Sequence, residues 1–145
     1  MMLVKRKTGK IDKKAKTNLM DRLDQHWRDQ VRERDNWKCR KCGRKKNQWT
    51  LEAHHVAARG LMSTRWEAIN GLSMCKLPCH DWATNNPDEA RIWACEVLGE
   101  DPYNAVVTLA RGVARYTIED LEELLKAFKA GEPVSKVAEM LEAAA

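Results

Sequence analysis

Two short segments with paired cysteines decide the fold of this 145-residue chain: Cys39-Arg40-Lys41-Cys42-Gly43 and Cys75-Lys76-Leu77-Pro78-Cys79-His80. The first pair is spaced C-x2-C and is followed by glycine, the usual form of a zinc knuckle. The second is spaced C-x3-C, one residue longer but within the range for zinc ligands. Thiolates on two tight turns can close a tetrahedral site, whose metal contributes folding energy directly. We therefore expect structural zinc here, with four ordinary thiols as the alternative.

The rest of the composition favours a cytoplasmic protein. Five cysteines are too few and too unevenly spaced for a disulfide scaffold. The fifth, Cys95, falls at helical spacing among apolar residues, which predicts a core position. No apolar run approaches the length of a membrane span, and residues 1–16 are basic without an apolar signal-peptide stretch. We expect no membrane association.

The formal net charge of +5 is unevenly distributed along the chain. Residues 1–46 hold 17 Lys and Arg against 6 Asp and Glu, whereas residues 117–145 hold 3 against 7. A strongly basic N-terminal third, followed by residues with little or negative net charge, is typical of a protein that binds a polyanion such as nucleic acid. A solvated basic tail without a partner would give the same charge, so the gradient alone leaves both interpretations open.

The apolar pattern predicts an α+β, mostly helical protein. Residues 1–16 are expected to form a flexible basic arm, because mutually repelling lysines cannot build a core. We expect residues 17–98 to form the core with its preceding helix, and residues 99–145 a C-terminal helical extension. Short strands are predicted over residues 50–56 and 71–74. Helices are predicted over residues 18–35, 80–85, 87–98 and 101–115, then after the capping pair Thr117 and Asp120, and from Ser135 onward.

Three of the four histidines, His54, His55 and His80, fall in the segment that carries the cysteine pairs. His80 directly follows Cys79, so a zinc knuckle would fix its position. His54 and His55 are adjacent, and on a strand their side chains point to opposite faces, so they cannot play the same part. One could bind a metal while the other acts as a base. Each histidine taken singly is more often an ordinary polar residue, but together around a four-cysteine knuckle they favour a functional site.

In chain order the motifs are Cys39-x-x-Cys42-Gly43, Leu51-Glu52-Ala53-His54-His55-Val56, Asn70-Gly71-Leu72-Ser73-Met74-Cys75 and Cys79-His80. This order resembles the HNH nuclease family, and most of all its small zinc-knuckle endonucleases of phages and prophages. The resemblance covers about residues 27–95. The helix end Arg32-Glu33-Arg34-Asp35 and the segment Thr64-Arg65-Trp66 are also similar to the phage members.

The resemblance implies a ββα-metal fold, in which a two-stranded hairpin and a helix surround one catalytic cation. His55 would then be the general base that activates water, and Asn70 would hold the loop and orient that base. His54 and His80 would bind the catalytic ion. The four cysteines, Cys39, Cys42, Cys75 and Cys79, would hold a structural zinc behind the active site, flanked by N-terminal and C-terminal helices. The extra residue between Cys75 and Cys79 departs from the family pattern.

The chemistry of the residues agrees with hydrolysis. A neutral imidazole, with an ordinary pKa of about 6.5, can take a proton from water at neutral pH. One divalent ion held by two imidazoles keeps open coordination positions and can stabilise charge that develops on a phosphodiester. Nitrogen ligands accept Zn, Ni, Co or Mn, with Mg less natural. Arg59 and Arg65, between His55 and Asn70, are candidate DNA phosphate clamps, with plain surface charge as the alternative.

We therefore expect a metal-dependent DNA endonuclease that uses a His general base and one divalent cation (Mg, Mn, Ni, Co or Zn) in addition to structural Zn²⁺. Double-stranded DNA is the expected partner, for a phage- or prophage-encoded protein in a bacterial cell. Two alternatives stay open: a non-catalytic zinc module that binds DNA or protein, and a structural zinc fold in which His54 or His80 replaces Cys79. The acidic C-terminal helices could pack on the domain, form a homodimer or dock on a phage protein.

Overall fold

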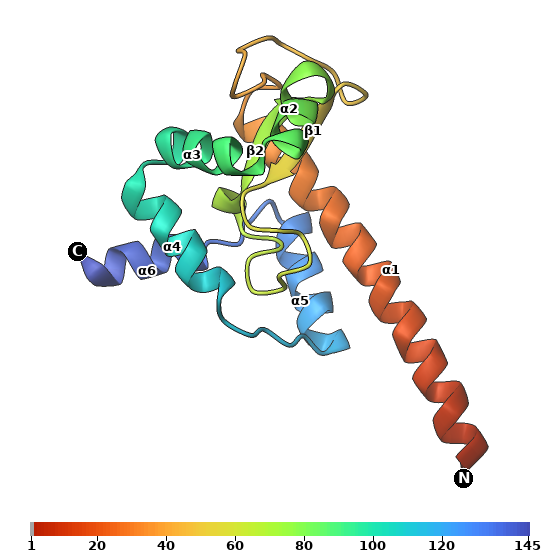
Figure 1. The fold of residues 1–145 in the computed structure, drawn as a ribbon. Helices are drawn as coiled ribbons and strands as arrows, with labels where there is room; N and C mark the ends of the chain where they lie inside the picture. The colour runs from red at the N-terminus through yellow and green to blue at the C-terminus, as the bar shows by residue number, and fades with distance from the viewer. Residues whose placement is uncertain (1) are drawn as a thin grey trace.

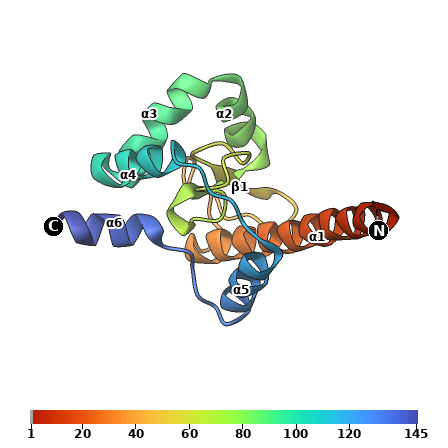
Figure 2. The ribbon, with the colours of Figure 1, turned by 90° about the horizontal axis from the view of Figure 1, so that it is seen from below.

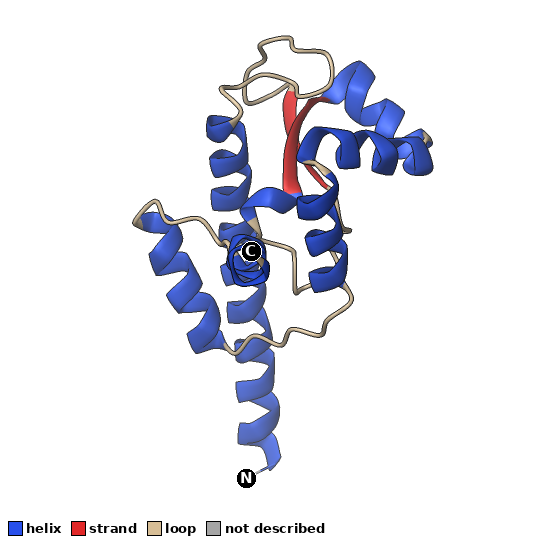
Figure 3. Ribbon diagram, turned by 90° about the vertical axis from the view of Figure 1, so that its left-hand side faces the viewer, coloured by secondary structure: helices blue, strands red, loops and turns tan. Residues whose placement is uncertain are grey.

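The computed structural model describes residues 2–145, with side chains from residue 12 onward, and is mostly helical around one two-stranded sheet (Figure 1, Figure 3). The helices are α1 (Met2–Arg34), α2 (Asp81–Asn85), α3 (Pro87–Leu98), α4 (Glu100–Ala110), α5 (Ile118–Lys129) and α6 (Lys136–Ala144). The strands are β1 (Leu51–His55) and β2 (Gly71–Cys75), and short helical turns at Ala68–Asn70 and Lys76–His80 flank β2. This confirms the predicted mixed, mostly helical class. Within residues 2–145, no helix combines the length and apolar character that crossing a membrane requires.

The first helix is longer than the sequence predicts. It runs without a break from Met2 to Arg34, so the backbone of residues 2–16, expected as a flexible arm, continues the helix expected from residue 18. Residues 2–34 contain no proline and are rich in lysine, a good helix former, so nothing interrupts the helix once its packed half has formed. The N-terminal half of α1 projects beyond the other elements (Figure 1, Figure 2). The domain boundary expected near residue 17 therefore falls inside a helix.

One hydrophobic core joins α1 to the C-terminal part of the chain. Leu23, Trp27 and Val31 of α1 are at most 1% exposed. They pack with Trp66 and with α5, which contributes Leu121, Leu125 and Phe128. α5 begins with the predicted capping box, in which Thr117 and Asp120 each accept the other's backbone N–H. The C-terminal extension thus folds back on the domain, as the packing alternative expected.

The last helix is anchored to the interior by a buried carboxylate. Glu67 is 1% exposed, and its carboxylate accepts the backbone N–H groups of Lys136 and Val137 at the start of α6, at 3.0 and 3.4 Å. Burial raises the pKa of Glu67, although these two N–H groups act in the opposite direction. Earlier in the chain, α4 ends at Ala110 rather than at residue 115 as expected. Gly112, a poor helix former, lies two residues after this end.

The two strands form an antiparallel hairpin whose register pairs His54 with Leu72 and His55 with Gly71. Gly71 is required here because of a close approach to α1: a Cβ atom would lie 2.4 Å from Val31 Cγ2 and 2.6 Å from Trp27 Cζ2. A second core beyond the hairpin contains Leu51, Met74 and the buried cysteines, packed against Ala83 and Ala90 of the following helices. The hairpin is therefore held between α1 on one side and α2 with α3 on the other.

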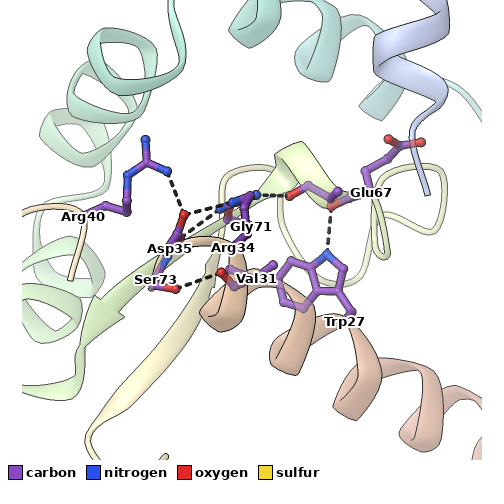
Figure 4. A network of polar contacts seen from close by, with 9 residues as sticks. Trp27, Val31, Arg34, Asp35, Arg40, Glu67, Gly71 and Ser73 are labelled. Atoms are coloured by element: carbon purple, nitrogen blue, oxygen red, sulfur yellow. Dashed lines mark hydrogen bonds and ion pairs between the residues drawn. The ribbon is translucent and has the colours of Figure 1, made fainter. Parts of the chain in front are cut away.

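Asp35 connects the end of α1 to β2 and to the first cysteine loop (Figure 4). Its carboxylate accepts hydrogen bonds from Arg34, from Arg40 Nη1 at 2.9 Å and from the backbone N–H of Ser73 at 3.0 Å. Burial opposes ionisation of Asp35, but these donors outweigh it and hold its pKa below the ordinary value. Arg34 also donates to the Gly71 carbonyl at 2.6 Å. The cysteine loop is thus fixed relative to the strand that carries Cys75.

Candidate functional site

The four cysteines predicted as zinc ligands come together. The sulfur atoms of Cys39, Cys42, Cys75 and Cys79 all lie within 4.8 Å of one another, and the Cys42 and Cys75 sulfurs are 3.9 Å apart. Cys95 lies apart from them in α3 and is half-buried. Among the described side chains, no other group of three or more cysteine, histidine or acidic residues is as compact. Cys79 belongs to the cluster, so the alternative in which a histidine replaces it is not supported.

Local backbone geometry explains why both cysteine pairs close. In the first loop, Gly43 adopts φ +75° and donates its N–H to the Cys39 carbonyl at 2.8 Å, which turns the chain tightly around the pair. In the second, Leu77 is extended (φ −132°, ψ 133°) and its side chain is 68% exposed. The extra residue of the C-x3-C spacing is therefore accommodated on the surface. Cys75 and Cys79 still reach the common centre.

The chemistry of this donor set fits a tetrahedral metal. Four sulfurs bound to zinc at about 2.3 Å lie about 3.8 Å from one another, close to the 3.9 Å between Cys42 and Cys75. Burial disfavours the Cys39 thiolate, but backbone N–H groups, with that of Cys42 the strongest, lower its pKa to about 7. Burial raises the pKa of the Cys75 and Cys79 thiols. A cation at the centre is the group that would hold all four as thiolates.

Two histidines from different elements face one another on the side of the hairpin nearer α2. The ring centres of His54, on β1, and His80, at the start of α2, are 5.5 Å apart with the rings at 71°. Glu52 shares a face of β1 with His54, and its carboxylate Oε2 contacts Nδ1 of His80. An ionised carboxylate can only accept a hydrogen bond. This contact therefore places the proton of a neutral His80 on Nδ1 and leaves the lone pair of Nε2 free to bind a metal.

His55 points to the opposite face of the hairpin, as the strand geometry predicts. Its ring stacks on Trp27, with centres 4.1 Å apart and 16° between the planes. Nε2 lies 3.2 Å from the Arg65 carbonyl oxygen, which can only accept, so Nε2 carries the proton and Nδ1 is the basic atom. A surface groove of about 420 Å³ reaches His55, Glu52 and His80. A neighbouring hollow of about 240 Å³ reaches His54 and His55.

Both adjacent histidines are neutral at neutral pH. Burial lowers the pKa of His54 to about 4, with the nearby His80 and His55 acting in the same direction. Burial also lowers the pKa of His55 to about 4, although its contact with the Arg65 carbonyl and the Asp24 charge oppose the change. A neutral imidazole is the form that can bind a metal or accept a proton.

Asn70 holds the loop between the strands. It is fully buried, and its side-chain amide donates to the carbonyls of Thr64 at 3.0 Å and Ala57 at 3.2 Å. Its side-chain oxygen accepts the Ala57 N–H at 2.7 Å. Thr64 immediately precedes Arg65, whose carbonyl contacts His55. Asn70 therefore fixes the loop that orients the His55 ring.

The two candidate phosphate clamps both bind Asp24 of α1. Arg65 forms two hydrogen bonds to its carboxylate, at 3.0 and 2.7 Å, and its side chain is 10% exposed. Arg59 donates to Asp24 Oδ2 at 2.8 Å but is 58% exposed. Burial opposes ionisation of Asp24, but the two arginines and Trp66 outweigh it and lower its pKa to about 2. Arg65 is thus committed to the interior and Arg59 alone of the two faces solvent.

Sequence reasoning missed two residues of this site, Glu52 and Asp24. Side chains of a strand alternate between its two faces, which places Glu52 on the same face of β1 as His54. The predicted strand could therefore have identified Glu52 as a neighbour of His54. Asp24 is one of several acidic residues on a basic helix and is 41 residues from Arg65, so no local pattern distinguishes it. Comparison of the chain with protein-family models, curated proteins and solved structures finds no match. The functional argument therefore stands on the geometry of the site and the motifs in the sequence.

Proposed function

We propose that this protein is a metal-dependent DNA endonuclease of the HNH type, which hydrolyses phosphodiester bonds with His55 as general base. One observation carries the proposal: His54 and His80 face one another beside a groove that also reaches His55, next to a four-cysteine cluster. The order of the motifs that resemble the HNH family supports the same conclusion.

The two facing histidines fit a single divalent ion. Two imidazoles bound to one ion at about 2.1 Å and a near-tetrahedral angle have ring centres roughly 5 to 6 Å apart, and those of His54 and His80 are 5.5 Å apart. Glu52 leaves Nε2 of His80 available as a ligand atom, in the way that carboxylates orient metal-bound histidines elsewhere. When bound, such an ion would polarise the phosphodiester and stabilise charge on the leaving oxygen.

The remaining steps fall to groups of this chain. Stacking on Trp27 and the Arg65 carbonyl hold the His55 ring so that Nδ1 can accept a proton from water. Asn70 keeps the loop that supplies this carbonyl in place. Arg28 and the exposed part of Arg59 line the same groove as His55 and supply positive charge for a phosphate.

A plasmid cleavage assay tests the proposal. The purified protein, freed of exchangeable ions, receives Mg, Mn, Ni, Co or Zn one at a time. We expect metal-dependent conversion of supercoiled DNA to open-circle or linear form, and a loss of at least 100-fold in rate for His55→Ala. His26→Ala is the matched control, because His26 lies on α1 against Phe128, away from the groove.

The outcomes separate the nuclease from the second candidate, a zinc module that binds DNA without cutting it. The cysteine cluster favours that candidate, since it is compatible with a purely structural metal. Retained cleavage in His55→Ala would reject the assignment of the base. No cleavage with any metal, in a folded protein with bound zinc, would reject the nuclease and leave the binding module.

A further inference from the structure

Trp49 is an exposed aromatic side chain that packing does not explain. It is 77% exposed, whereas the other five tryptophans, Trp27, Trp37, Trp66, Trp82 and Trp93, are buried or half-buried. A packed tryptophan buries about 150–250 Å² of surface, so an exposed one forgoes a large stabilisation. Its backbone is nevertheless fixed, because Asn47 Oδ1 accepts the N–H of Trp49 at 2.9 Å and that of Thr50 at 3.2 Å.

The loop that precedes Trp49 is strongly basic. Residues 38–46 contain six Lys and Arg and no Asp or Glu. Arg40 is paired with Asp35, and Lys41 lies over the Trp82 ring at 4.2 Å. Lys38, Arg44 and Lys45 are exposed and form no salt bridge within the described side chains. An anion is the complementary partner for this loop, which we call the basic loop.

Trp49 also lines the groove that reaches His55 and His80. The groove of about 420 Å³ is bounded by Trp49 and Gln48 at one part and by His55, Glu52 and His80 at another. Arg28 and Arg59 line it as well. An aromatic face, positive charge and two of the candidate histidines, His55 and His80, therefore belong to one surface. Aromatic faces combined with positive charge are how proteins bind nucleic acid whose bases are unpaired.

We propose that Trp49 stacks on an unpaired nucleobase, and that the substrate class of this site is single-stranded DNA or DNA with locally unpaired bases. Inside an intact duplex both faces of each base are covered by neighbours, so a tryptophan at the surface has no face to stack on. The basic loop contacts the phosphates of the same strand. The inference rests on the proposed nuclease function and deepens it, because it narrows the double-stranded partner expected from the sequence.

Binding without cleavage tests this inference. Fluorescence anisotropy of a labelled 20-nucleotide single strand and of the matching duplex is measured with the full-length, zinc-loaded protein carrying His55→Ala and no added divalent ion. We expect Trp49→Ala to weaken single-strand binding about tenfold and duplex binding less than about threefold, since base–aromatic stacking contributes roughly 1–3 kcal/mol per base. Trp49→Phe keeps an aromatic face and should retain most of the single-strand affinity.

Two further variants serve as controls. Ile92→Ala removes another exposed apolar side chain, 62% exposed and outside the groove, and should leave both affinities unchanged. Replacing Lys38, Arg44 and Lys45 together by alanine should weaken both forms of DNA and reduce the dependence of affinity on salt, because phosphate contacts carry no strand preference. Bound zinc and far-UV circular dichroism verify that each variant is folded.

The outcomes distinguish this inference from the proposed function. Unchanged single-strand binding in Trp49→Ala, an equal loss for both DNA forms, or no single-strand binding by the parent protein would overturn the stacking role. A protein that binds single strands through Trp49 but never cleaves would retain this inference and reject the nuclease. If Trp49→Ala leaves single-strand binding and cleavage unchanged while cleavage still requires His55, the nuclease is retained and the stacking role of Trp49 is rejected.

Discussion

The cysteine cluster and the groove that reaches His55 and His80 adjoin the same short hairpin, yet they are built in different ways. The four cysteine sulfurs lie within 4.8 Å of one another, and the three buried cysteines pack in a core with Leu51 and Met74. In the groove, by contrast, His55 is held by Trp27 and the Arg65 carbonyl, and His80 by Glu52. A closed set of identical donors is suited to a structural metal, whereas oriented side chains around an open groove are suited to a reaction. We therefore expect folding of the cysteine region to depend on an ion, and the arrangement of the groove to depend on protein contacts alone.

The largest expected effect is at the cysteine cluster. Cys39→Ser should abolish tight zinc binding and unfold the hairpin, because structural zinc contributes about 10–16 kcal/mol in small zinc domains. Elemental analysis for zinc and thermal unfolding with and without a chelator provide the measurement. Cys95→Ser, outside the cluster, should leave the zinc content at one ion per chain. An unchanged melting temperature after removal of zinc would contradict the structural role of the cluster.

A smaller effect is expected where Glu52 orients His80. Glu52→Gln replaces a charged acceptor of the His80 Nδ1–H group by a neutral one, and it should weaken binding of the exchangeable ion 10- to 100-fold. Titration calorimetry with Mn or Ni, on protein that keeps its zinc, measures this directly. The preference of His80 for a proton on Nδ1, read from its ¹⁵N chemical shifts, should weaken in the same variant. A variant with full ion affinity would show that Glu52 has no positioning role.

The smallest expected effect is on the loop that supports His55. The lowered pKa of Asp24, about 2 against an ordinary 3.8, corresponds to about 2 kcal/mol of stability. This contribution is fully present above about pH 4 and is lost as the pH falls through 2, because protonation breaks the pairs with Arg59 and Arg65. Urea unfolding of the wild-type protein and Asp24→Asn should differ by about 2 kcal/mol at pH 7 and converge in acid. A constant difference at every pH would reject this account.

Local spacing predicted much of the fold. The strands at 51–55 and 71–75, the break between α2 and α3 and the capping box of α5 all depend on neighbours within a few residues. The first sixteen residues are a different case, because the helix described over residues 2–16 depends on packing farther along the chain. Charge repulsion suggested disorder over residues 1–16, but a prolonged helix costs little once Leu23, Trp27 and Val31 anchor its other half.

The sequence by itself determined the cysteine cluster, because paired thiols on tight turns can close on only a few partners, and it placed the three histidines on one hairpin and the helix that follows. Only the tertiary structure decided which contacts hold each of those histidines. The crossing of α1 over the hairpin brings Trp27 to His55 and Asp24 to Arg59 and Arg65, and turns Arg65 from a candidate clamp into an interior support. Contacts between residues some 30 to 40 positions apart depend on how whole elements pack, and no local pattern encodes them.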